Sequence, residues 1–277
     1  MKIAVTGASG FIGRRLVSKL KAAGDDVCAV SLRGAPQGRD FAGCEAVIHL
    51  AGEPVAQRWT AAARERIRSS RVEGTRRLVT ALRDAPPAVL ISASAAGYYG
   101  SRGDEILTEK AAPAEDFLGR VAVEWEREAQ AAEAFGVCVA RLRIAMVLGR
   151  DGGALQQMLL PFRLGIGGRI GSGKQWMSWI HIEDLVSLID FALRNPTRGV
   201  LNACAPNPVR NDDFTRELAR ALHRTAVLPV PVFALKLLFG EMAGIVYASQ
   251  RIVPGAALDA GFRFQFPEVG AALRDLV

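Results

Sequence analysis

The chain has 277 residues, half of them apolar, and a formal net charge of +7. A chain of this length and apolarity can bury one large core, or one core and a small lobe, so we predict a soluble globular protein. The arginines are spread over many segments without interleaved aromatic residues or a nucleic-acid motif, which indicates a solvated basic surface and excludes nucleic acid as the expected partner.

The cysteines and the apolar runs indicate a cellular location. The four cysteines lack the spacing of a metal site or a disulfide framework, so we expect buried thiols and no bound metal. The most apolar run, Ala226 to Phe239, is shorter than a bilayer span and contains Pro229, Pro231 and Lys236. No signal peptide precedes the first expected strand. We therefore predict a cytoplasmic protein without a membrane partner.

The N-terminal residues predict a strand followed by a helix. Lys2 to Thr6 is apolar and β-branched, as expected of a strand buried on both faces. Ile12, Leu16 and Leu20 recur every four residues and predict one buried face of a helix, which Gly24 ends.

Three glycines, Gly7, Gly10 and Gly13, separate this strand from this helix. The first allows a tight turn, the second lets main-chain amides approach a pyrophosphate, and the third lets the helix pack on the strand. Glycines also occur in ordinary loops, but a position directly between a strand and an amphipathic helix is what dinucleotide binding requires. We predict that the following residues contact the cofactor: Gly7, Ser9, Gly10, Phe11, Ile12 and Gly13.

The second strand, Asp26 to Leu32, ends where this kind of fold contacts the adenosine ribose. An acidic residue there would bind the ribose 2′-hydroxyl, but this chain has Ser31 and Arg33, which together favour a 2′-phosphate. We therefore predict NADP rather than NAD as the cofactor. The alternative is that Arg33 is a loop residue that points into water.

The connection from Gly34 to Glu45 is too short for a complete crossover helix, so the second βαβ unit must be abbreviated. The next strand, Ala46 to Leu50, leads into Ala51 and Gly52, whose small size lets the main chain approach the cofactor. We predict cofactor contacts for Leu50, Ala51 and Gly52. Glu53 follows at the ligand-binding edge of the sheet and is either a catalytic group or a solvated loop acid.

The following segments complete the expected sheet. A long helix from Thr60 to Leu82 precedes a strand at Ala88 to Ser92, and the loop after that strand carries Ser94 and Tyr98, two candidate catalytic residues. A further helix and a further strand follow, at Ala114 to Phe135 and at Val137 to Arg143. Strands alternating with helices predict a Rossmann-type, doubly wound parallel sheet of the α/β class.

Beyond residue 150 the pattern becomes irregular. We predict a cofactor domain over residues 1–150, completed by about residues 178–204, and a smaller substrate lobe from residues 151–177 and 205–277. Three residues are candidates for the substrate side of the cleft: Gln175, Trp179 and His181. His181 has the alternative of a purely structural role at the junction of the two parts.

Taken together, these motifs resemble the extended short-chain dehydrogenase/reductase superfamily over nearly the whole chain. The matching segments are Thr6 to Gly13, His49 to Gly52, Val72 to Thr75, Tyr99 to Gly100 and Ile180 to Asp184. More narrowly, the chain is similar to the "epimerase family" branch with a C-terminal domain of unknown function. This narrower resemblance rests on Ala51 to Glu53, Arg58 to Thr60, Ser92 to Gly100, Gly171 to His181 and Ala205 to Pro208.

The resemblance implies a Tyr-x-x-x-Lys pair for proton transfer, in which the lysine lowers the pKa of the tyrosine. This chain has no such pair, because the expected positions hold Asp116 or Phe117 and Arg120 or Val121. The family's serine position falls on Ser94 or Ala95. Its asparagine position holds Arg71, and the branch implies that Arg71 binds the cofactor's ribose or phosphate.

Two functions follow from these observations. The first is an NADP-dependent oxidoreductase or sugar-nucleotide epimerase that acts on a small polar substrate, with a nucleotide-linked compound as one candidate. The second is a catalytically silent protein that senses NADP(H) and regulates another protein. The missing Tyr-x-x-x-Lys pair favours the second, and the intact substrate lobe favours the first. The sequence does not specify the oligomeric state.

Overall fold

The computed structural model describes residues 1–226 and 228–277, and its centre is a parallel sheet. In this part of the chain the sheet has six strands, paired in the order β10-β6-β4-β3-β1-β2. Their bounds are Gly199–Ala203 (β10), Cys138–Ile144 (β6), Val89–Ala95 (β4), Ala46–His49 (β3), Lys2–Thr6 (β1) and Asp26–Val30 (β2). Every pairing in it is parallel, so the predicted Rossmann-type sheet is confirmed.

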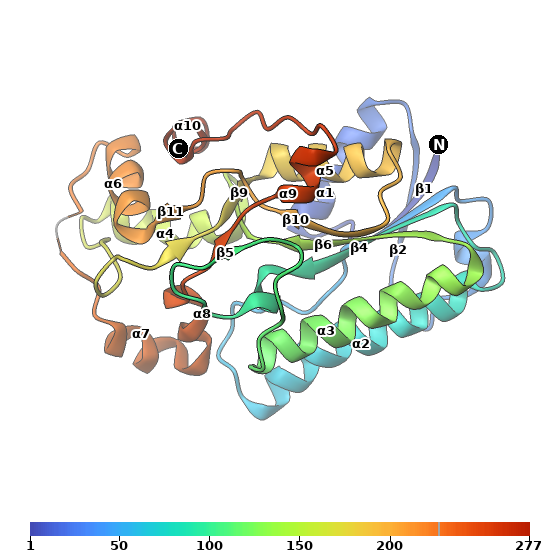
Figure 1. Ribbon diagram of the computed structural model, residues 1–277, viewed down its shortest axis with the longest axis horizontal. Coiled ribbons are helices and arrows are strands. Elements are labelled where there is room, and N and C mark those ends of the chain that lie inside the picture. Colours follow the sequence, from blue (N-terminus) through green and yellow to red (C-terminus); the bar gives the residue numbers. More distant parts are fainter. Residues whose placement is uncertain (227) are drawn as a thin grey trace.

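Helices cover both faces of the sheet. Figure 1 shows α2 (Ala61–Leu82) and α3 (Phe117–Gln130) side by side along one face, and α1 (Phe11–Ala22) with α5 (Ile182–Arg194) along the other. Apolar side chains on alternate positions of the strands meet these helices, which gives one buried core on each face. The sheet is therefore a three-layer α/β structure whose strands share one carboxyl edge.

The predicted helices form, with small changes at their ends. Thr60 caps α2, because its side chain accepts a hydrogen bond from the main chain of Ala63. The helix expected to start at Ala114 starts instead at Phe117, since the Asp116 side chain caps it by accepting from the Gly119 amide. Its last turn tightens into the 3₁₀ helix η3 (Ala131–Phe135).

The connection between β2 and β3 is abbreviated, as expected. It contains only a 3₁₀ helix, η1 (Gly38–Phe41), with Phe41 buried against the sheet. A crossover helix and a further strand are absent from this described segment, so β2 is the edge strand of the sheet.

The remaining elements form a lobe beside the sheet, at the left of Figure 1. A third apolar core holds much of this lobe together. The described elements of this lobe, together with the short segments that connect it to the sheet, are η2 (Ala96–Tyr99), β5 (Ile106–Leu107), β7 (Met146–Gly149), α4 (Gly153–Arg163), β8 (Trp176–Met177), β9 (Trp179–His181), β11 (Val209–Arg210), α6 (Asn211–Ala221), α7 (Val232–Phe239), η4 (Gly240–Met242), α8 (Ala243–Tyr247), β12 (Arg251–Ile252), α9 (Gly255–Asp259) and α10 (Val269–Leu276).

Part of the apolar run 226–239 forms α7, whereas Val227 lies outside the described residues. Over residues 1–226 and 228–277, no helix combines the length and the apolarity that a membrane crossing requires.

Candidate functional site

The glycine turn after β1 is packed too closely for side chains. Gly7 has a φ of +72°, and a Cβ atom there would lie 2.8 Å from the Ala51 amide nitrogen. A Cβ atom on Gly13 would lie only 2.1 Å from the Gly7 carbonyl oxygen. Main chain therefore packs directly on main chain, between the turn and the segment Leu50–Gly52 that follows β3.

The N-terminus of α1 offers free hydrogen-bond donors. Gly10 occupies the cap position, so no side chain caps the first turn, and that turn contains no acidic residue. The first amides of a helix have no partner within the helix, and they carry the positive end of its dipole. Ser9 is exposed at the mouth of the turn. This arrangement can bind a diphosphate through the main chain.

Phe11 and Ile12 belong to the same turn, but their side chains point into the protein. Both are half-buried and pack against the core that α1 shares with the sheet. The Phe11 ring also fills the space beside Gly149 and Gly152, where added Cβ atoms would lie 2.3 and 2.5 Å from ring carbons. Any contact of these two residues with a ligand would therefore use their main chain.

A buried histidine supports the turn from below. The His49 ring lies 2.7 Å from the Thr6 hydroxyl through Nδ1 and 2.9 Å from the Thr75 hydroxyl through Nε2. Burial, helped by the nearby charge of Arg71, lowers the pKa of His49 to about 4. The imidazole is therefore neutral and links β1, β3 and α2. Sequence reasoning did not identify this role.

The end of β2 carries the residues expected to recognise a 2′-phosphate. Ser31 and Arg33 are both exposed, and the Arg33 amide donates to the Ser31 hydroxyl at 3.3 Å. Within the described residues, the Arg33 guanidinium makes no hydrogen bond or ion pair. Its charge is available to a ligand at the cofactor edge of the sheet.

Arg71 is a half-buried cation next to Gly52. Its Nη1 donates to the carbonyl oxygens of Glu53 and Ile67, at 3.0 and 3.1 Å, and its guanidinium lies 5.2 Å from the Trp125 ring. Burial lowers the pKa of Arg71 to about 10, so it stays charged at neutral pH. No carboxylate forms an ion pair with it in the described part of the chain, and the buried Trp125 indole N–H there has no acceptor.

Glu53 does not have the surroundings of a general base. Its side chain is 32% exposed, and Oε1 accepts hydrogen bonds from Gln57 at 3.1 Å and from Arg66 at 3.4 Å. The Gln57 hydrogen bond, followed by the bond and charge of Arg66, lowers the pKa of Glu53. The carboxylate is therefore ionised, and Gln57 and Arg66 stabilise its charge within the protein.

Ser94 belongs to a buried network that spans the sheet. Its hydroxyl donates to Glu126 at 2.7 Å, and Glu126 accepts two hydrogen bonds from Arg143, at 2.7 and 2.9 Å. Arg143 also donates to the Tyr99 hydroxyl at 2.9 Å, which itself donates to Asn202 at 2.6 Å. All five side chains are at least nine-tenths buried.

The protonation states follow from this geometry. Burial alone would lower the pKa of Arg143, but the hydrogen bonds and charge of Glu126 raise it above its usual value. Burial raises the pKa of Tyr99 to about 12, so its phenol keeps its proton. The Ser94 proton is directed at Glu126, and only the lone pairs of its oxygen remain for another partner.

Tyr98 lies at the border of this network. Its ring is half-buried, and the Arg143 guanidinium carbon is 3.3 Å from the ring centroid. In the part of the chain that the structure describes, the Tyr98 hydroxyl makes no hydrogen bond. Among the three candidate catalytic residues, Tyr98 therefore has the side chain least committed to the protein.

The positions where the family's Tyr-x-x-x-Lys pair would fall have other roles. Asp116 caps α3 through the Gly119 amide at 2.8 Å, and the Arg120 guanidinium binds the Glu115 carbonyl oxygen. Phe117 packs edge-on against Trp59. These residues cannot form a phenol–ammonium pair.

The three residues predicted on the substrate side lie in the lobe junction. Trp179 is fully buried, and its indole N–H donates to the Asn207 carbonyl oxygen at 3.2 Å. His181, 1% exposed, caps α5 and stacks on Phe266 with the ring centroids 3.9 Å apart. Gln175 is half-buried and donates to a neighbouring carbonyl oxygen at 3.2 Å. Of the three, Gln175 alone keeps a partly exposed side chain.

Comparison with known proteins places this site in a family. Residues 3–204 match the model of the NAD dependent epimerase/dehydratase family, and residues 230–276 match a domain of unknown function, DUF1731. The "Epimerase family protein SDR39U1 homolog, chloroplastic" of Arabidopsis thaliana is 41% identical, over 100% of this chain and 87% of its own length. The "Epimerase family protein YfhF" of Bacillus subtilis is 37% identical, over 100% of this chain and 98% of its own length.

A solved structure is similar over the same extent. The crystal structure of human epimerase family protein SDR39U1 (isoform 2) with NADPH superimposes with a TM-score of 0.92 at 34% identity, covering 100% of this chain and 99% of the human chain.

Proposed function

Because the chain belongs to the NAD dependent epimerase/dehydratase family, we propose that it binds NADP(H) and transfers a hydride between this cofactor and a small polar substrate. The observation that carries the proposal is the side-chain-free contact between the glycine turn and Leu50–Gly52, beside a helix N-terminus with free donors. The human relative that superimposes on this chain was crystallised with NADPH, which supports the same assignment.

The residues present fit the cofactor. The main chain of residues 7–13 would hold the diphosphate, and Ser31 with Arg33 would hold the 2′-phosphate. The main chain of Leu50–Gly52 and the cation of Arg71 would flank the adjoining ribose. When bound, the nicotinamide supplies or accepts a hydride. The substrate class that we propose is a nucleotide-linked sugar or a similar polar carbonyl compound.

The chain itself must supply the proton that accompanies the hydride. Glu53 is a poor candidate because its carboxylate is already paired, and Ser94 is a poor candidate because its proton is directed at Glu126. We assign proton transfer to Tyr98. Its ring lies 3.3 Å from the Arg143 guanidinium carbon, and its hydroxyl makes no hydrogen bond within the described residues, so the phenol is free to meet a substrate oxygen.

Titration of the purified chain with NADPH and NADH, followed by NADPH oxidation against a panel of carbonyl compounds, tests this function. We expect binding of NADPH that is tighter than that of NADH, and oxidation of NADPH with at least one substrate. Tyr98→Phe should bind NADPH as the wild type does but lose at least a hundredfold in kcat, since general acid–base catalysis contributes about 10²–10⁴-fold.

Failure of the wild type to bind either nucleotide would refute the proposal. Full activity of Tyr98→Phe would leave cofactor binding standing and remove Tyr98 from the reaction.

Two observations favour a second function. Asp116 and Arg120 do not replace the missing proton-transfer pair, and the Ser94 hydroxyl is committed to a buried carboxylate. The chain could therefore bind NADP(H) without turnover and act as a sensor. Tight NADPH binding with no oxidation across the whole panel would select this function over the first.

A further inference from the structure

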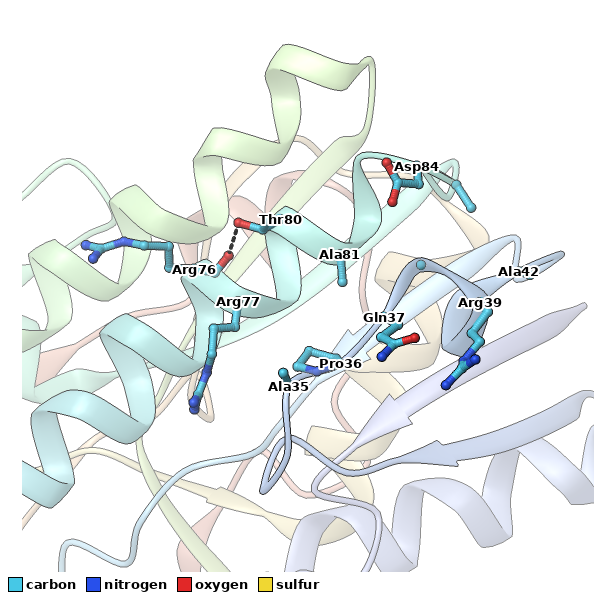
Figure 2. Close-up of a pocket in the computed structure, with 12 residues that line it drawn as sticks. Ala35, Pro36, Gln37, Arg39, Ala42, Arg76, Arg77, Thr80, Ala81 and Asp84 are labelled. Carbon is cyan, nitrogen blue, oxygen red and sulfur yellow. Dashed lines mark hydrogen bonds between the residues drawn. The ribbon is translucent and has the colours of Figure 1, made fainter.

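A pocket of about 800 Å³ lies between the abbreviated connection after β2 and the second half of α2 (Figure 2). It is lined by Ala35, Pro36, Gln37, Gly38, Arg39 and Ala42 from the connection, and by Arg76, Arg77, Thr80, Ala81, Asp84 and Ala85 from α2 and the turn after it. It occurs beside the segment in which a complete second βαβ unit would have carried a crossover helix and a further strand. The shortened connection forms one wall of the pocket.

The pocket carries an excess of positive charge. Three arginines and one acid, Asp84, line it. The Arg76 guanidinium is held by Glu128 through hydrogen bonds of 3.0 and 2.7 Å. Within residues 1–226 and 228–277, by contrast, Arg39 and Arg77 make no side-chain hydrogen bond or ion pair. Both are exposed, so their guanidinium groups are available to a ligand.

The two available arginines come from opposite walls. Figure 2 shows Arg77 extending from α2 past Ala35 and Pro36, and Arg39 extending from η1. Small apolar side chains, among them Ala35 and Ala81, line the space between. Guanidinium groups above an apolar floor suit a flat ring that carries a phosphate, because the ring can pack on the floor while the fork of donors binds the phosphate oxygens.

The pocket begins, along the chain, close to a residue that the proposed function assigns to the cofactor. Its lining begins at Ala35, two residues after Arg33, the residue to which we assign the 2′-phosphate of NADP(H). We propose that Arg77 and Arg39 bind the 2′-phosphoadenosine end of NADP(H) and, with Arg33, set the preference for NADP(H) over NAD(H). This inference rests on the proposed function and adds to it two specificity-determining residues, one from α2 and one from η1.

Nucleotide affinities of substituted chains test this inference without any measurement of activity. We would titrate NADPH, NADH and the fragment 2′-AMP by calorimetry into wild type, Arg77→Gln and Arg39→Gln. The matched control is Arg76→Gln, since Arg76 is the neighbouring residue on the same helix but is bonded to Glu128. All three positions are exposed, so the substitutions should not prevent folding.

We expect Arg77→Gln to weaken NADPH and 2′-AMP binding by tenfold or more, because it removes charge-assisted hydrogen bonds to the phosphate. Arg39→Gln should act in the same direction, and both should leave NADH binding unchanged. Arg76→Gln should alter none of the three affinities.

Two outcomes would overturn the inference while leaving the proposed function intact. One is a wild-type preference for NADPH that survives both Arg77→Gln and Arg39→Gln, which would leave Arg33 alone responsible. The other is simultaneous binding of NADPH and 2′-AMP, which would place the fragment in a site that the cofactor does not use. Failure of the wild type to bind either dinucleotide would instead refute the proposed function, and the inference with it.

Discussion

Two regions at the carboxyl edge of the sheet are built in opposite ways. The glycine turn, residues 7–13, is one continuous segment that presents main-chain donors without a side-chain cap. The network around Glu126 and Arg143 is assembled from side chains of five separate elements, and its two charges form an ion pair with each other. The turn is therefore suited to take a ligand, whereas the network is a closed support.

This difference bears on the search for catalytic residues. A buried ion pair with complete hydrogen bonding gains nothing from a further partner, and breaking it leaves an uncompensated charge. We infer that Glu126 and Arg143 hold the end of β4 in place and that chemistry belongs to groups at the border of the network, such as Tyr98. If the turn is open and the network is closed, substitutions in the two regions should differ in their effects on stability and on ligand binding.

The largest effect is expected from opening the network. Glu126→Ala would leave Arg143 buried without its partner, so we expect a loss of about 3–5 kcal/mol in the free energy of unfolding. Urea denaturation of wild type and variant measures the difference. Glu105→Ala is the control: it removes the exposed partner of Arg102 and should cost less than about 1 kcal/mol. Equal costs for the two variants would show that the network is not a closed buried unit.

The sequence was sufficient to predict the turn but not the network. The glycine spacing, the buried strand before it and the shortened connection after β2 are local patterns, and the structure contains each of them. Glu126 and Arg143 are 17 residues apart, on a helix and a strand, and no short-range pattern links them. A signal was nevertheless present, because Glu126 lies on the apolar face of α3 and Arg143 follows the buried Leu142 in β6.

The contacts at the lobe junction could not be predicted from the sequence either. His181 was a candidate substrate residue because it lies in a motif near the expected cleft. Its Nε2 lies 3.2 Å from an oxygen of Asp275, and its ring stacks on Phe266. Both partners are at least 85 residues further along the chain, so only the tertiary structure could identify them. Sequence periodicity identifies faces of single elements, but it does not identify the contacts between distant ones.

The second largest effect on stability is expected from His49, the buried residue beneath the turn. Burial lowers the pKa of His49 from 6.5 to about 4, so below pH 6.5 the unfolded chain binds a proton that the folded chain does not. Stability should therefore fall between pH 6.5 and pH 4, by about 3 kcal/mol from this group. Urea denaturation at several pH values should show a shallower fall for His49→Gln.

The control for this prediction is His223→Asn, because His223 is exposed and has a positive φ that asparagine tolerates. It should keep the wild-type fall in stability. An unchanged pH dependence in His49→Gln would mean that the imidazole under the turn is protonated in the folded protein. The neutral state that we assign to His49 would then be wrong.

Gly13→Ala is expected to change stability least. It is nevertheless the most direct test of the turn. The added methyl group would lie 2.1 Å from the Gly7 carbonyl oxygen, so the turn must shift, at a cost of about 1–3 kcal/mol. Because the same main chain is assigned to the diphosphate, we expect NADPH affinity by calorimetry to fall by more than tenfold.

Gly74→Ala in α2 is the matched control, since the nearest atom to its added methyl group is 3.9 Å away. Helical alanine is more favourable than glycine, so this variant should be at least as stable as the wild type and should bind NADPH equally well. If Gly13→Ala also kept its affinity, the close packing of the turn would serve only the fold. The contrast between an open ligand-binding region and a closed support would then have to be abandoned.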